Sequence, residues 1–347
     1  MNSTPGRRNC GGALHSRPHD LMRSRTVTLL TVPVAVLVFT ASVYYLSMHF
    51  RWREAFAVLL KADFVKLAVM ITLSHFAYIV VRACRWRVAV RDVIPGVSWL
   101  DCYWITAIAV SLSVVTPLQL GEALKIELMK RRGLGRLPGV GAFALERLLD
   151  LIVVSLMAAT GIFLGRFSKI YRGVQAGAVV LIIFAFAVLY LLLHFDPGGR
   201  ISVWLVNLRR ASTSPKNWAA MGFLTVLSWT LVGIGWNFAL RGVRIHLAIP
   251  GILTLVSMVT VGLLLSFVPG GLGVSEVVTM TILTNMGIAT ATAQAGALVL
   301  RAYTVVIFLF GLAHLAVWLL CGSHSRRKPH PHTGVAYSEK PNLVSEL

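Results

Sequence analysis

Charged side chains inside long apolar stretches are the residues of this sequence with the most informative chemistry. Glu146, Arg147 and Asp150 lie near the start of the apolar stretch 140–164. On a helix, Glu146 and Asp150 at i and i+4 share a face, and Arg147 can pair with Asp150 three residues later. Charge inside a membrane segment is typical of an ion pair or a transport pathway. The alternative is that Arg147 extends to the membrane interface along its apolar stem.

Arg301 is the second such residue, and it stands alone in the stretch "AGALVLRAYTVVIFLF". Glu276, 25 residues earlier in the chain, is its candidate partner. A guanidinium binds phosphate through a two-pronged fork. We predict that Arg147 and Arg301 face the interior and bind an anionic head group, with Glu146, Asp150 and Glu276 holding them. Glu276 is also the candidate for coupling protonation to movement.

Two Pro- and Gly-rich breaks accompany these charges. The sequence "PLQLG" begins at Pro117 and "PGGLG" begins at Pro269, 152 residues later. The break residues expected to interrupt the helices are Pro117, Gly121, Pro269, Gly270, Gly271 and Gly273. Such residues end a helix and allow unusual backbone angles, and unpaired backbone groups cannot face lipid. We therefore expect both breaks to lie against a polar cavity or inside protein.

The same order of features follows each break. Glu122 follows the first break and Glu276 the second, and then Arg147 and Arg301 each open a long apolar stretch. We interpret this order as an internal repeat, which the sequence leaves open as parallel or inverted. Each acid is expected in the first turn of a helix, whose N-terminus favours anions. The alternative is a pair of plain tight turns with capping acids.

Composition identifies the class of protein. Of 347 residues, 56% are hydrophobic and only 13% are charged, against about a quarter in soluble domains. The net charge of +20 is spread over many short loops, which favours contact with anionic lipid rather than nucleic acid. The four cysteines are far apart in sequence and predict neither a metal site nor a disulfide framework. We expect no cofactor and no metal.

The apolar stretches predict an all-α polytopic membrane protein. Runs of about 20 apolar residues are long enough to cross a bilayer. Eight spans are expected, near 27–48, 65–83, 99–116, 140–164, 174–194, 218–240, 251–268 and 295–320. Interfacial helices are expected at 51–64 and 200–210, and the Gly161–Gly165 and Gly173–Gly177 pairs suit close helix packing. The transmembrane domain would cover 27–321, between disordered basic tails at 1–26 and 322–347.

The distribution of Lys and Arg predicts the orientation. Eight crossings place Arg91 and Arg241 on one side and Arg136 and Lys216 on the other. The bias favours both termini in the cytoplasm. No D-x-D pair or G-x-S-x-G elbow indicates an enzyme. His75 and His314 lie on apolar spans and are interpreted as satisfied core or interface residues.

Three stretches in this order resemble the lysylphosphatidylglycerol synthase transmembrane, or flippase-like, family: "VRACRWRVAV", "SLSVVTPLQLGEALKIELMKRRG" with "GAFALERLLDLIVV", and "LLSFVPGGLGVSEVVTM" with "LVLRAYTVVIFL". The resemblance spans roughly 30–320 and implies lipid translocation or handling of lipid head groups. The residues that match the family pattern are Pro117, Gly121, Glu122, Glu146, Arg147, Asp150, Pro269, Gly271, Gly273, Glu276 and Arg301. The soluble aminoacyl-transferase domain of full-length synthases has no counterpart here, so synthesis of a lysyl-lipid is not predicted.

The resulting functional hypothesis is a transporter in the inner cell membrane that moves an anionic lipid, or a lipid of the polyprenyl or terpenoid type, between leaflets. One alternative is an accessory or enzymatic subunit of a lipid or lipid-linked glycan pathway, and a weaker one is a small-solute permease. Membrane lipids with anionic head groups are the expected partners. A lipid-biosynthesis enzyme and a second copy of the chain are the candidate protein partners.

Overall fold

The computed structural model describes residues 36–37, 40–130, 132–165, 183, 187, 215–265 and 268–322. These ranges contain helices and no strand, which confirms an all-α polytopic membrane protein. Four helices within them are long and apolar enough to cross a bilayer: α3 (Phe64–Val90), α6 (Arg136–Gly165), α9 (Pro215–Arg241) and α12 (Thr290–Gly322). Apart from residues 183, 187 and 322, these ranges do not include the expected span at 174–194, the interfacial helix at 200–210, the Gly173–Gly177 pair or either tail.

Two further apolar helices are shorter and end at the predicted breaks. Helix α4 (Trp99–Ser113) has 15 residues and α10 (Ile249–Leu265) has 17. At about 1.5 Å per residue they reach only about 22 and 26 Å, short of the bilayer core of about 30 Å. A 3₁₀-helix follows each of them, η1 (Pro117–Ala123) and η2 (Pro269–Gly271). Each break therefore follows a described helix that is shorter than the bilayer core.

Each short helix is one arm of a hairpin that returns to the end where it began. After η1, helix α5 (Leu124–Lys130) brings Arg132 to within 2.8 Å of Asp101, in the first turn of α4. After η2, helix α11 (Val274–Asn285) brings Met286 beside Gly251, where an added methyl group would be 3.7 Å from the Met286 sulfur. The regions 117–130 and 269–287 are re-entrant, as predicted.

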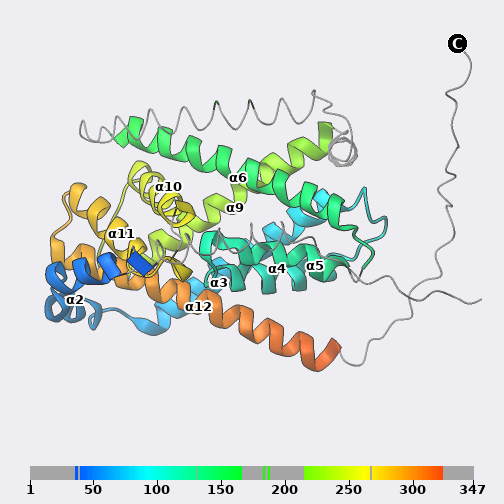
Figure 1. The fold of residues 1–347 in the computed structure, drawn as a ribbon. Coiled ribbons are helices and arrows are strands. Elements are labelled where there is room, and N and C mark those ends of the chain that lie inside the picture. Colours follow the sequence, from blue (N-terminus) through cyan, green and yellow to red (C-terminus); the bar gives the residue numbers. More distant parts are fainter. Residues whose placement is uncertain are drawn as a thin grey trace, which may run out of the picture.

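The two hairpins enter from opposite ends of the bundle (Figure 1). Helices α3 and α9 run antiparallel, because Asn217 at the start of α9 donates to Asp92, just after α3, at 2.8 Å. The first hairpin begins at that end. The second begins at the other end, where Gly242 packs against Leu67. The predicted placement of Arg91 opposite Arg136 and Lys216 is wrong, because α4 and α5 turn back instead of crossing.

The tips of the two hairpins meet, and each hairpin packs on the long helix that follows the other hairpin. Elements η1 and η2 are in contact. Gly161 of α6 lies so close to α10 that an added methyl group would be 2.6 Å from the Thr254 hydroxyl, and Gly311 of α12 is similarly tight against Ser111 of α4. Small residues allow such approaches between membrane helices. These contacts of α4 with α12 and of α10 with α6 hold both tips inside the bundle.

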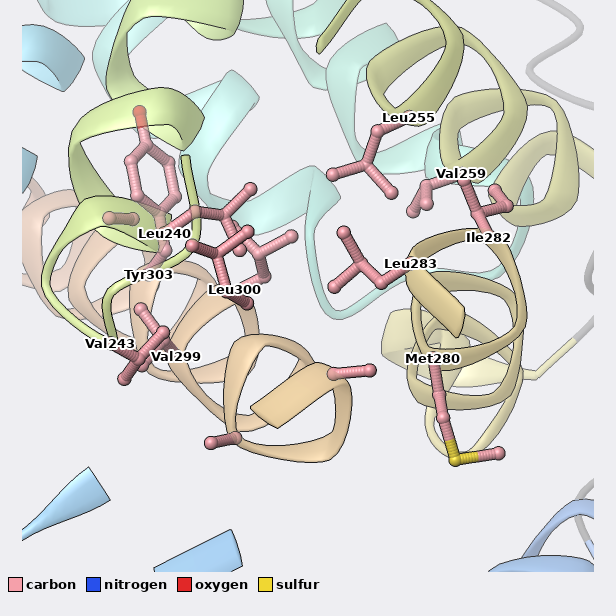
Figure 2. Close-up of a cluster of buried hydrophobic side chains, with 14 of the residues drawn as sticks. Leu240, Val243, Leu255, Val259, Met280, Ile282, Leu283, Val299, Leu300 and Tyr303 are labelled. Carbon is pink, nitrogen blue, oxygen red and sulfur yellow. The ribbon is translucent and has the colours of Figure 1, made fainter. Parts of the chain in front are cut away.

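A large apolar cluster fixes the second hairpin. Figure 2 shows Leu255 and Val259 of α10 facing Ile282 and Leu283 of α11, beside Leu300 of α12. At the end of this cluster, helix α2 (Trp52–Leu59) confirms the expected helix at 51–64, and Gln294 near the start of α12 donates to the His49 carbonyl at 2.9 Å. The second hairpin is thus anchored by apolar packing near its own end of the bundle.

Candidate functional site

A buried ionic network, here called the first cluster, surrounds the first hairpin. It contains seven charged residues from three elements: Arg82 and Arg85 of α3, Glu122 and Lys125 of the hairpin, and Glu146, Arg147 and Asp150 of α6. Six of them are buried and Arg147 is part-buried. Such a set of charges is stable inside a membrane domain only if each charge is paired and hydrogen-bonded.

Arg85 joins the two acids of α6. Its Nε lies 3.1 Å from Glu146, and its two terminal nitrogens lie 2.6 and 3.1 Å from the Asp150 carboxylate. This two-pronged contact is the strong geometry of an Arg–carboxylate pair. The Thr225 hydroxyl lies 3.1 Å from the same guanidinium, and Trp229 donates to Asp150 at 3.1 Å. Arg85 thereby ties α3 to α6 and, through Thr225, to α9.

Glu122 joins the hairpin to both neighbouring helices. One carboxylate oxygen accepts from Arg82 of α3 at 2.6 Å and from Arg147 of α6 at 2.7 Å. Lys125 lies 3.4 Å from the same oxygen and donates to Glu146 at 2.6 Å. Glu122 lies in η1 and not in the first turn of the following helix, so that prediction is wrong: the 3₁₀-helix continues to Ala123. Its partners are cations, not a helix N-terminus.

The first cluster carries more positive than negative groups. Four basic residues face three acids, which leaves one positive charge. The buried Nε atoms of Arg82 and Arg147 have no hydrogen-bond partner in the described part of the chain. Arg147 keeps 27% of its side chain exposed, while it binds Glu122 and Asp150. It therefore does not extend freely to the interface, because two acids hold its guanidinium inside the bundle.

The second cluster is a single ion pair at the second hairpin, formed by Glu276 and Arg301. The Arg301 guanidinium also donates to the carbonyls of Gly270 and Gly271 at 2.9 and 3.2 Å and to the Ser275 hydroxyl at 2.6 Å. Glu276 accepts from the Gly273 N–H at 2.9 Å, so it caps the first turn of α11 as expected. Every nitrogen of Arg301 is engaged with its own hairpin.

A cavity of about 340 Å³ opens beside the first cluster. Arg82, Arg147 and Asp150 line its polar part, and Trp236 and Ile307 contribute to its apolar wall. A smaller cavity of about 60 Å³ lies against Arg301 and Ser275. Gln119, at the tip of the first hairpin, lines both cavities. A charged region continuous with an apolar wall suits a molecule with a polar head and an apolar tail.

The structure brings together all six predicted polar site residues, in two groups. Glu122, Glu146, Arg147 and Asp150 join the first cluster, and Glu276 pairs with Arg301. Arg82, Arg85 and Lys125 were missed. Arg82 and Arg85 share a helix face at i and i+3, and this spacing could have indicated a second pair of buried arginines. It was missed because the predicted span ended at 83 and placed Arg85 in a loop. Helix α3 runs on to Val90.

The two histidines differ. His314 is satisfied, because Nε2 lies 2.9 Å from the Tyr103 hydroxyl and Nδ1 lies 2.8 Å from the Phe310 carbonyl. His75 is not, since its buried Nε2 has no partner among the described residues, and the interpretation as a satisfied core residue is wrong for it. His75 lines the larger cavity. Within the described ranges, no group of three His, Cys, Asp or Glu residues could hold a metal ion.

Long apolar helices, facing re-entrant hairpins and a buried charge network beside a cavity define a polytopic membrane protein with an internal polar site. Residues 32–311 match the family model described as the lysylphosphatidylglycerol synthase TM region, and the chain belongs to that family. The family indicates a membrane role related to lipids. No curated protein matches the chain in sequence.

Proposed function

We propose that this protein moves an amphipathic lipid with an anionic head group between the two leaflets of the inner cell membrane. The observation that carries the proposal is the cavity of about 340 Å³ that joins the positively charged first cluster to an apolar wall. A head group crossing a low-dielectric layer requires fixed polar partners, while its tails stay among apolar groups. Arg147, which lines this cavity and is part-exposed, is the proposed contact for the anion.

We further propose that the two hairpin units are an inverted internal repeat. Each unit runs from a long helix through a short helix, a 3₁₀ break and a second short helix to another long helix. In each unit a Glu pairs with an Arg 25 residues later, Glu122 with Arg147 and Glu276 with Arg301. The antiparallel course of α3 and α9 supports the inverted sense. Inverted repeats with broken helices at the midplane are a common transporter design.

Alternating exposure follows from this symmetry. In the described conformation the cavity lies at the first cluster, and Arg301 is closed against its own hairpin. Rocking of one unit against the other would open the second cluster and close the first. We place the end that holds Arg91, Arg132 and Lys216 in the cytoplasm on the positive-inside bias, together with the C-terminal end of α12. The first expected span begins outside the described residues, so the N-terminus is placed with it on sequence grounds.

The test is lipid movement in liposomes that contain the purified protein and phosphatidylglycerol with a fluorescent label. A membrane-impermeant reductant then destroys the label in the outer leaflet only. We expect the protein to speed the loss of inner-leaflet label at least tenfold, and Arg147→Ala to remove most of that gain. Arg136→Ala is the matched control, because Arg136 is an exposed arginine on the same helix, away from the cavity.

Two outcomes would contradict the proposal. If no anionic lipid moves faster with protein than without it, the accessory or enzymatic subunit of a lipid pathway becomes the better hypothesis. If Arg147→Ala and Arg136→Ala slow movement equally, the cavity is not the route. Movement of a zwitterionic lipid at the same rate as phosphatidylglycerol would remove the anionic head group from the substrate class.

A further inference from the structure

Gln119 holds a backbone conformation that glycine normally supplies. Its φ is +54°, and Arg244 is the one other non-glycine residue with positive φ in the described part of the chain. Glycine adopts this left-handed region without strain, and among the other residues Asn, Asp and His tolerate it best. The residue 152 positions later in the second hairpin is Gly271, with a φ of +58°. The two hairpin tips thus share a backbone shape, but only the first carries a side chain at this point.

That side chain stands at the junction of the two cavities. Gln119 lines the large cavity together with Arg147 and the small cavity together with Arg301. It is half-buried, and its side-chain amide has no hydrogen-bond partner within the described residues. A tight turn gains nothing from a glutamine here, since glycine would make it with less strain. The turn itself therefore does not require a side chain at this position.

We propose that the Gln119 amide contacts the substrate head group as it passes between the two clusters, a proposal that rests on the transport function above. An amide offers two donors and one acceptor, so it can bond both to anionic oxygens and to a hydroxyl or amine of the same head group. It carries no charge, so it binds more weakly than the arginines. A pathway requires such intermediate contacts, because a ligand held too firmly at one place does not leave it.

Gln119→Gly separates this role from a structural one. Glycine keeps the turn, relieves the strain and removes the side chain together with its amide. We expect the midpoint of thermal unfolding in detergent to stay level or rise, while the rate of phosphatidylglycerol movement falls about tenfold. Gln119→Asn keeps an amide on a residue that tolerates this backbone region, and we expect it to retain part of the rate.

Arg244→Gly is the matched control. Arg244 has a φ of +62°, is exposed, and lies in the turn after α9 rather than on either of these cavities. Glycine there relieves the same kind of strain, so stability should again stay level or rise, but the rate of lipid movement should not change. A Gln119→Gly protein that folds and moves lipid at the native rate overturns the role of Gln119 and leaves the proposed function intact.

A second measurement covers the case in which the native protein moves no lipid. The thermal unfolding midpoint is then followed while phosphatidylglycerol or neutral diacylglycerol is added in detergent. Stabilisation by phosphatidylglycerol alone, reduced in Gln119→Gly, supports the head-group contact without transport. Equal stabilisation of both proteins, or none in either, overturns the contact.

Discussion

The two ionic clusters share a motif but differ in what their charges hold together. In both, a Glu of the hairpin pairs with an Arg 25 residues later. The first cluster links α3, the hairpin and α6 through seven charged residues and keeps one positive charge in excess. The second is one pair in which Arg301 closes its own backbone break. The same motif thus gives a buried network beside a cavity in the first hairpin and a closed clamp in the second.

This difference has an energetic consequence. In the first cluster each acid has two or three cationic partners on different helices, so removing one residue leaves several buried charges short of a partner. Breaking a buried ion pair from one side costs about 3–5 kcal/mol, more than the pair itself contributes. In the second cluster the surroundings are mostly backbone carbonyls and hydroxyls. Substitutions should therefore be more harmful in the first cluster.

The largest effect is expected for Arg85→Leu. It removes the link between Glu146 and Asp150 and leaves both carboxylates inside the bundle with fewer partners. We expect the free energy of unfolding to fall by about 3–5 kcal/mol. The measurement is thermal unfolding in detergent, together with the yield of monodisperse protein. Native-like stability in this variant would show that the network does not hold α3 to α6.

The next comparison is Glu122→Gln against Glu276→Gln, which removes one negative charge from each cluster. Glutamine at 122 can still accept one hydrogen bond, but it raises the excess of positive charge in the first cluster from one to two, so we expect a loss of about 3 kcal/mol. Glutamine at 276 can still accept a hydrogen bond from Arg301 or from the Gly273 N–H, so we expect about 1–2 kcal/mol. Both values come from unfolding curves under one condition. Equal losses would mean that the second cluster contributes as much to the free energy of unfolding as the first.

Arg301 provides a smaller and more specific test. Arg301→Ala removes the cationic partner of Glu276 and the donor to two carbonyls of the break, and we expect a loss of about 2 kcal/mol and slower lipid movement. Arg301→Lys keeps the charge but not the fork, so partial retention of both is expected. If Arg301→Ala has the stability and the lipid-movement rate of the native protein, the contacts of Arg301 contribute to neither property.

Much of this arrangement could be predicted from the sequence, and the rest could not, for physical reasons. Pro269 and the glycines after it indicated a break, because few other residues end an apolar helix. The pairing of Arg301 with Glu276 could be predicted because the two residues are only 25 positions apart and no other charge lies between them. The contact of Arg85 with Asp150 joins residues 65 positions apart, which depends on how helices pack. The left-handed backbone of Gln119 was also hidden, because glutamine does not signal it.

The smallest change in stability is expected at an exposed ion pair that has the same i, i+3 sequence spacing as a pair in the first cluster. Glu122 and Lys125 form a buried pair at 3.4 Å, with 3% and 0% of their side chains exposed. Five residues further on, Glu127 and Lys130 form a pair at 3.5 Å with 58% and 47% exposed. Exposed pairs contribute about 0–1 kcal/mol, because water solvates both charges once they separate.

We therefore expect Glu127→Gln to change the free energy of unfolding by less than about 0.5 kcal/mol. The loss in Glu122→Gln, measured in the same detergent and salt, should be several times larger. Raising the salt concentration should reduce the small effect at Glu127 further and leave the large one at Glu122 nearly unchanged, because buried pairs are screened much less. Equal sensitivity to salt at both positions would mean that water reaches Glu122, and that the first cluster is an open vestibule rather than a buried network.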